Sequence, residues 1–206
     1  MIKTLGLALA GLSLAAPAAP AAPAAPAAPA APAAPALMAA TTPKAPPPVF
    51  TLRSPNFANG KPLGTVNEYN GAGSGCHGGN KAPTLTWSGE PAGTRSFAVY
   101  VYDPDAKPNG WVHWFVYNIP AKAHKLTDAS APTYTLGATS FGKAKYGGPC
   151  PPLHDKAHHY YFTLIALRVA HVNAPRGAAL DRNQFIRATG PRWIRHVSII
   201  GTFRRP

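Results

Sequence analysis

The chain has 206 residues, 25 of them proline, and a formal net charge of +13 at pH 7. Seven arginines lie between Arg176 and Arg205, and Asp181 is the only acid among them. A basic balance of this kind is typical of proteins that bind nucleic acid or an anionic envelope surface. The sequence offers no recognition helix, zinc-ligand spacing or aromatic stacking repeat. We therefore expect no nucleic-acid partner and interpret the arginines as a solvated basic face.

Residues 1–16 follow the pattern of a secretory signal. Lys3 supplies a positive charge, residues 5–14 are apolar, and small residues follow. The run is shorter than the roughly 20 apolar residues that span a bilayer. No cysteine follows it, which argues against a lipid-modified N-terminus. We expect a periplasmic or secreted protein; the cleavage position stays open, and an uncleaved N-terminus or the basic surface could contact the membrane.

Residues 17–48 form a low-complexity segment in which proline recurs at every third position from Pro17 to Pro35. Proline removes backbone donors and clashes with the preceding turn, so the intervening alanines cannot form a helix. Polyproline II has three residues per turn, which places these prolines along one edge. The segment is predicted to be a disordered, semi-rigid spacer.

Residues 49–206 are long enough for one domain with a good core. Runs of β-branched and aromatic residues separated by Gly- and Pro-rich turns predict strands. Because several runs are apolar on both faces, the predicted class is mostly β, an antiparallel β-sandwich. One C-terminal helix is expected over 180–195, capped by Asp181 and ended or kinked by Pro191. The predicted strands are 50–52, 85–87, 96–102, 111–119, 160–167 and 196–203.

The strands 96–102 and 111–119 should form a hairpin across the loop 103–110, which brings Asp103 close to His113. His158 and Tyr160 should share a face of their strand, because side chains alternate along it. The same alternation predicts one common face for Trp111, His113, Phe115, Tyr117 and Ile119.

These residues together have the chemistry of a small anion pocket. Free histidine titrates near pH 6.5, so two imidazoles could present positive charge to a phosphate or carboxylate. Asp103 is expected to bond the far nitrogen of His113 and fix its tautomer. Asp105 could attract a ligand ammonium, and Trp111 or Tyr160 could add a cation–π contact.

The cysteines, Cys76 and Cys150, allow two interpretations. An even count in an exported protein favours a disulfide, which would stabilise the fold by roughly 4 kcal/mol in the chain-entropy model. The competing interpretation makes Cys150 a nucleophile beside His158.

Catalytic and metal alternatives have weaker support. The sequence contains no Gly-x-Ser-x-Gly elbow and no serine clearly placed beside a pocket histidine. A zinc site could use His154, Asp155 and His158, but Pro151-Pro152 and the following strand argue against the helix that this spacing needs. We expect no catalytic residue, no metal and no cofactor.

The motifs resemble the phosphatidylethanolamine-binding protein family, especially its bacterial Raf-kinase-inhibitor-like branch. The resemblance covers nearly all of residues 49–205. It rests on Cys76 with Gly78-Gly79-Asn80, Leu85-Thr86-Trp87, Pro91 to Thr94, Phe97 to Ala106, Trp114 to Pro120, Phe141-Gly142, Tyr146 to Pro152, His158 to Leu167 and His196 to Arg204. It implies a β-sandwich-like fold with a pocket at one sheet end, in which Asp103, His113, Pro152, His158 and Tyr160 fall on pocket positions. Lys107 before Pro108, His159 in place of arginine, and the additional His154 depart from the family pattern.

We therefore expect non-catalytic binding of small anionic ligands of the phosphate, phosphoethanolamine or carboxylate type, including a phospholipid head group. The alternative is an inhibitor or scaffold that docks on an envelope hydrolase or a kinase. The expected ligand-binding residues are Asp103, Asp105, Trp111, His113, Pro152, His158 and Tyr160.

Overall fold

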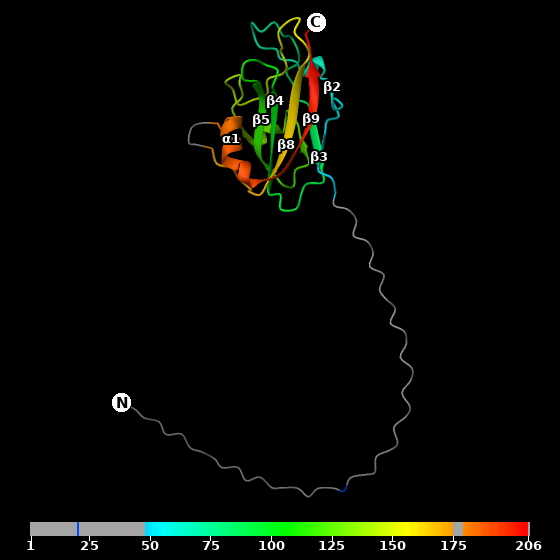
Figure 1. Cartoon of the computed structure of the whole chain (residues 1–206), viewed down its shortest axis with the longest axis vertical. Helices are drawn as coiled ribbons and strands as arrows, with labels where there is room; N and C mark the ends of the chain where they lie inside the picture. The colour runs from blue at the N-terminus through cyan, green and yellow to red at the C-terminus, as the bar shows by residue number, and fades with distance from the viewer. Residues whose placement is uncertain (1–19, 21–47, 175–178, 206) are drawn as a thin grey trace, which may run out of the picture. The chain divides into compact units, whose positions relative to one another are not determined.

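The computed structural model describes Pro20, residues 48–174 and residues 179–205 (Figure 1). The predicted signal segment lies outside these residues, and so does the predicted spacer apart from Pro20 and Pro48. The chain divides into two units, Met1–Lys44 and Ala45–Pro206, and the second contains every element described below. No helix among the described residues is both long and apolar enough to cross a bilayer.

Two sheets form the second unit, as predicted for a mostly β fold. The larger has six strands in the order β2-β9-β8-β4-β5-β7, and all its pairs are antiparallel except β2 with β9. The smaller has the order β1-β3-β6 and is antiparallel throughout. The strands are β1 (Thr51–Arg53), β2 (Lys61–Pro62), β3 (Leu85–Ser88), β4 (Ser96–Asp103), β5 (Trp111–Pro120), β6 (Lys125–Leu126), β7 (Thr135–Leu136), β8 (His158–Leu167) and β9 (Trp193–Phe203).

Short helical turns and one α-helix complete the unit. The α-helix is α1 (Arg182–Thr189), and 3₁₀ turns cover Thr65–Asn67, Ala131–Thr133 and Gly190–Arg192. The Asp181 carboxylate accepts a hydrogen bond from the Gln184 amide at 2.7 Å, and the Gln184 side chain accepts one from the Asp181 amide at 3.0 Å. This reciprocal cap fixes the start of the helix. The predicted cap and the end at Pro191 are confirmed.

The central strands are buried on both faces, which explains their continuous apolar runs. One cluster fills the space between the two sheets and includes Leu52, Trp87, Phe97 and Phe162. A second cluster lies between the large sheet and α1, whose Phe185 is fully buried. Burying a side chain of this size contributes about 1.5–3 kcal/mol. Figure 1 shows β4, β5, β8 and β9 side by side with α1 beside them.

The predicted common face of β5 is wrong because the strand contains two irregularities. Trp114 lies opposite Val101, but Val112 lies opposite Tyr102, so His113 is an extra residue. A second extra residue precedes Ile119, where Asn118 has a positive φ of 59°. Each bulge reverses the alternation of side chains. Phe115 and Tyr117 consequently pack toward α1, whereas Trp114, Val116 and Ile119 face the inter-sheet core.

The predicted helical range 180–195 is also too long. The chain is already a strand at Trp193, and Arg195 pairs with Ala166 of β8. Pairing with a buried neighbouring strand outweighs local helix propensity there. The hairpin of β4 and β5 across the loop 103–110 is confirmed.

Candidate anion pocket

A cavity of about 420 Å³ lies at one end of the large sheet. β4 ends there at Asp103, β5 begins there at Trp111, and β8 begins there at His158. All the residues expected from sequence line it: Asp103, Asp105, Trp111, His113, Pro152, His158 and Tyr160. The structure adds Tyr69, Ser74, Ala106, Lys107, Phe141, Gly148, Cys150, Pro151 and Asp155 to the lining.

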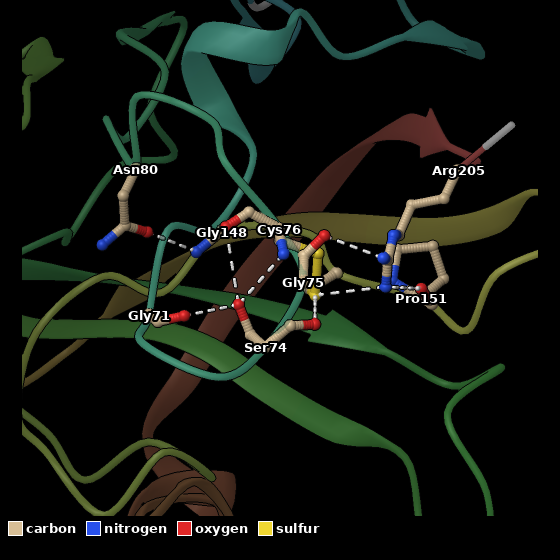
Figure 2. The surroundings of a disulfide bond; sticks show 9 residues. Gly71, Ser74, Gly75, Cys76, Asn80, Gly148, Pro151 and Arg205 are labelled. Atoms are coloured by element: carbon tan, nitrogen blue, oxygen red, sulfur yellow. Dashed lines mark hydrogen bonds between the residues drawn. A yellow bond between two sulfur atoms is a disulfide. The ribbon is translucent and has the colours of Figure 1, made fainter.

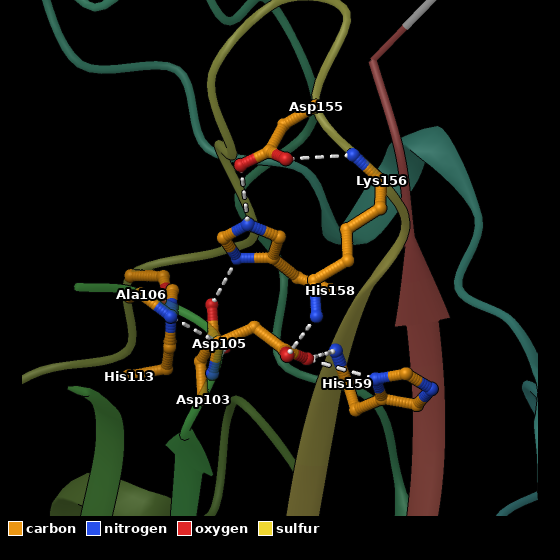
Figure 3. Close-up of polar contacts among 9 residues, drawn as sticks. Asp103, Asp105, Ala106, His113, Asp155, Lys156, His158 and His159 are labelled. Atoms are coloured by element: carbon orange, nitrogen blue, oxygen red, sulfur yellow. Dashed lines mark hydrogen bonds and ion pairs between the residues drawn. The ribbon is translucent and has the colours of Figure 1, made fainter.

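His158 lies between two carboxylates (Figure 3). Its Nδ1–H donates to Asp103 Oδ2 at 2.8 Å, and its Nε2–H donates to Asp155 Oδ2 at 3.2 Å. The His158 and Asp103 side chains are buried, whereas 45% of the Asp155 side chain is exposed. Burial opposes the charge, but the bonds to Asp103 and Asp155 outweigh it and raise the pKa of His158. His158 is therefore the cationic imidazole of the pocket.

The predicted bond from Asp103 to His113 is wrong. Asp103 lies opposite Trp111 in the hairpin, and its carboxylate turns instead toward β8, the other neighbour of β4. Its second oxygen accepts the backbone amides of Asp105 at 2.8 Å and Ala106 at 3.2 Å. The orienting role predicted for Asp103 thus applies to His158.

His113 is a neutral imidazole. It is buried, and its Nδ1–H donates to the Gly147 carbonyl at 2.7 Å. Burial lowers the pKa of His113 to about 4, because the loss of solvation outweighs the raising effect of the nearby carbonyls and of Asp103. Nε2 then carries the lone pair and acts as an acceptor. The expectation of two cationic imidazoles is therefore wrong for His113.

Asp105 is already paired within the chain. Lys156 Nζ donates to it at 2.8 Å, and the amide and Nδ1 of His159 do so at 2.9 and 2.8 Å. Partial burial opposes ionisation, but these bonds prevail and hold the pKa of the Asp105 carboxyl well below its usual range. The same pair raises the pKa of Lys156. A ligand ammonium would have to compete with both donors.

Aromatic rings form the walls of the cavity. Tyr160 lies edge-on to His113, with ring centroids 5.0 Å apart, and Phe141 packs against Trp111 at 5.4 Å and His113 at 5.5 Å. The Tyr160 hydroxyl is buried and has no hydrogen-bond partner among the described residues. Burial and the nearby Asp103 carboxylate raise the pKa of Tyr160, so the phenol stays protonated. Tyr160 lines the cavity, and its hydroxyl is a buried donor without an acceptor among the described residues.

Cys76 and Cys150 form a disulfide, as predicted (Figure 2). The competing interpretation, which made Cys150 a nucleophile beside His158, is therefore wrong. The Arg205 guanidinium donates to the carbonyls of Gly75 at 2.8 Å and Pro151 at 3.3 Å, and so joins the same two loops. The disulfide and Arg205 together fix the rigid segment that leads to Pro152.

Sequence reasoning did not assign Phe141 to the site and considered Asp155 only as a zinc ligand. The spacing of Asp155 three residues before His158 was the available signal for their contact. Both nitrogens of His158 face carboxylates, and no group of three or more potential metal ligands converges among the described residues.

The fold agrees with the comparisons, and the chain belongs to the phosphatidylethanolamine-binding protein family. The family model matches residues 53–204. The chain is 44% identical over 141 residues to YbcL of Escherichia coli K12, covering 64% of this chain and 76% of YbcL. It is 40% identical over 140 residues to the Mycobacterium tuberculosis protein named "Putative lipoprotein LppC", covering 68% of this chain and 65% of LppC.

Solved structures agree with the family assignment. The crystal structure of Escherichia coli YbcL, described as a new member of the mammalian PEBP family, matches with a TM-score of 0.70 and 36% identity. The match covers 76% of this chain and 99% of that one. CT736 from Chlamydia trachomatis matches with a TM-score of 0.66 and 28% identity, covering 76% of this chain and 98% of that one.

Proposed function

We propose that the pocket binds a small anion of the phosphate or carboxylate type, including a phosphoethanolamine head group, without catalysing its conversion. One observation carries the proposal: the cavity is lined both by the charged His158 and by Tyr160, whose buried hydroxyl has no hydrogen-bond partner among the described residues. A buried donor without an acceptor costs about 1–3 kcal/mol, which an anionic oxygen would recover. Neutral His113 could accept a hydrogen bond from the hydroxyl group of a monoprotonated phosphate.

The cavity volume supports a small ligand. At about 420 Å³ it lies near the lower end of the range typical of small-molecule sites. Its aromatic walls and few polar groups resemble the lining of such sites. A head group or a free organic anion fits this description without any cofactor.

Calorimetric titration with phosphoethanolamine tests the proposal. Tyr160→Phe removes only the hydroxyl and should weaken binding about tenfold, the equivalent of one hydrogen bond to a charged group. Tyr117→Phe is the matched control, because Tyr117 is also buried with an unpartnered hydroxyl but lies outside the pocket. Absence of binding by the wild-type protein to phosphoethanolamine and to inorganic phosphate would refute the proposal.

We further propose a periplasmic or secreted location, with no nucleic-acid partner. The signal-like residues 1–16 support export, and the name of LppC points to the envelope for that relative. Fractionation of cells producing the full chain tests this. Recovery of the protein in the cytoplasm alone would contradict it.

Docking on an envelope protein is a second candidate function, with a hydrolase or a kinase as the class of partner. It is favoured by exposed Arg95, Arg168, Arg192 and Arg195, which come from the ends of adjacent strands. None of the described arginines forms an ion pair with an acid of the chain. Crosslinking in envelope extract should capture a partner with the wild type and lose it with Arg192→Ala/Arg195→Ala. Capture that is unaffected by this double substitution would count against the role of these arginines.

A further inference from the structure

The two carboxylates on His158 are held in different ways. Asp103 is buried at the end of β4, and two backbone amides fix its second oxygen. Asp155 belongs to the loop between Pro152 and β8, and its side chain is 45% exposed. Its other oxygen accepts only the amide of the adjacent Lys156, at 2.8 Å. Asp103 is thus part of the framework, whereas the Asp155 side chain can rotate away from the pocket at little cost.

Asp155 also lies on the side of His158 where a ligand would bind. Nδ1 faces the buried Asp103, so Nε2–H is the donor that a bound anion could use. That donor is already taken by Asp155 (Figure 3). Asp155 lines the cavity together with Tyr160 and His113. Two carboxylate or phosphate groups cannot share one N–H without repulsion. An anionic ligand therefore has to displace Asp155.

We propose that Asp155 occupies the anion position on His158 and thereby determines the selectivity of the pocket. A simple anion must separate Asp155 from His158 and leave that carboxylate unpaired beside the ligand. A ligand with an ammonium group next to its anion gives the displaced carboxylate a new partner. Asp155 thus disfavours simple anions and favours zwitterionic ligands such as phosphoethanolamine. This inference rests on the proposed function of the pocket as an anion site.

Other charges around the site agree with this assignment. Asp105 is already engaged by Lys156 and His159 and so is not free to receive a ligand ammonium. Asp103 is buried and bonded through both oxygens. Among the carboxylates that line the cavity, Asp155 is therefore the one that can most easily leave its present partner and bind a ligand ammonium.

The test is calorimetric titration of the full chain with inorganic phosphate and, separately, phosphoethanolamine. The variants are Asp155→Asn, which keeps the shape, and Asp155→Ala, which removes the acceptor. The matched control is Asp128→Asn, which makes the same charge change at a similarly exposed aspartate (41%) outside the pocket. Working at about pH 6, below the usual value for histidine, favours the charged form of His158, and NMR of the His158 resonance in each variant checks its protonation.

Both Asp155 variants should bind inorganic phosphate at least tenfold more tightly than wild type, and phosphoethanolamine by a smaller factor. The preference for phosphoethanolamine over phosphate should therefore shrink, whereas Asp128→Asn leaves it unchanged. If the Asp155 variants bind phosphate no better than wild type while wild type binds either ligand, Asp155 is no competitor and the anion site stands. If no protein binds either ligand, the proposed function fails, and this inference fails with it.

Discussion

The two ends of the large sheet differ in how their charged side chains are arranged: they are paired at one end and, among the described residues, exposed without ion pairs at the other. At the end where β4 finishes and β8 begins, Asp103 and Asp155 each accept a hydrogen bond from His158, and all three residues line the cavity. At the other end, β4 begins opposite the end of β8, and Arg95, Arg168, Arg192 and Arg195 surround these termini. These four arginines are exposed and form no ion pair among the described residues.

The difference follows from solvation. A charge removed from water is tolerated only when it is paired and hydrogen-bonded, so the pocket end needs defined partners. An exposed arginine is solvated and needs none. The pocket end should therefore be sensitive to single substitutions and to pH, whereas the arginine end should tolerate change. The following experiments test this difference, first at the pocket end and last at the arginine end.

Asp103→Ala should have the largest effect, a loss of about 5 kcal/mol in the free energy of unfolding. It leaves the buried His158 without one partner, and it leaves the amides of Asp105 and Ala106 without a hydrogen-bond acceptor. Urea unfolding measures the loss. Asp103→Asn, which removes the charge but keeps an acceptor for the amides, should cost clearly less. An equal cost for both would show that the bonds to the two amides contribute nothing and that the whole loss comes from the carboxylate charge.

Removing the disulfide should come next. A cross-link between residues 74 positions apart stabilises a fold by about 4 kcal/mol in the chain-entropy model. The double variant Cys76→Ser/Cys150→Ser should lose about this much, and the wild-type protein should lose it on reduction. Reductant should have no effect on the double variant. Equal stability of the oxidised and reduced wild type would contradict the role of the bond.

The pH dependence due to His113 should be somewhat smaller. Its pKa is about 4 in the fold against 6.5 for the model group, so the unfolded chain binds more protons between these values. Stability should therefore fall by about 3 kcal/mol as the pH drops from 6.5 to 4. Unfolding of wild type and His113→Gln across this range isolates the effect, because other groups contribute equally to both. Parallel curves would mean that His113 does not titrate between these limits.

His158 should contribute with the opposite sign. Its pKa is raised in the fold, so its stabilising charge is fully present below the ordinary histidine value and is lost as the pH rises through the raised pKa. The maximum of stability should accordingly lie between the two titrations. Histidine resonances followed by NMR would assign each pKa, and a His158 pKa below that of His113 would contradict the assignment.

Arg195→Gln at the opposite end should have the smallest effect. Arg195 is exposed and forms no ion pair with the described acids, so the free energy of unfolding should change by no more than about 0.5 kcal/mol. At low salt the variant should be neutral or slightly more stable, because one of several neighbouring like charges is removed. A loss above about 1 kcal/mol would show that this end also depends on specific charge contacts.

Much of the domain could be predicted because its signals are local. The hydrophobic runs placed β4, β5, β8 and β9 within a few residues of their observed bounds. Asp181 and Pro191 marked the ends of α1. The two-residue strands Lys61–Pro62, Lys125–Leu126 and Thr135–Leu136 were missed, because so short a segment becomes a strand only through its neighbour.

The residues that line the site were predicted correctly, but the hydrogen bonds between them were not. The expected residues line one cavity because they lie at or near strand ends that meet at the same end of the large sheet. Asp103 was nevertheless assigned to His113, because only the hairpin neighbour was visible in the sequence. The bulge at His113 and the pairing of β4 with β8 decide which imidazole receives the carboxylate.

The sequence alone thus determined most of the strand content and the residues that gather at the pocket, and it favoured the disulfide over a free thiol, since these depend on residue type and spacing. Only the tertiary structure decided that His158 is charged and His113 neutral, and that Asp155 accepts the hydrogen bond from Nε2–H of His158. The physical reason is that the charge of a side chain depends on its burial and its partners. Both arise from strands that are distant in the chain and adjacent in the sheet.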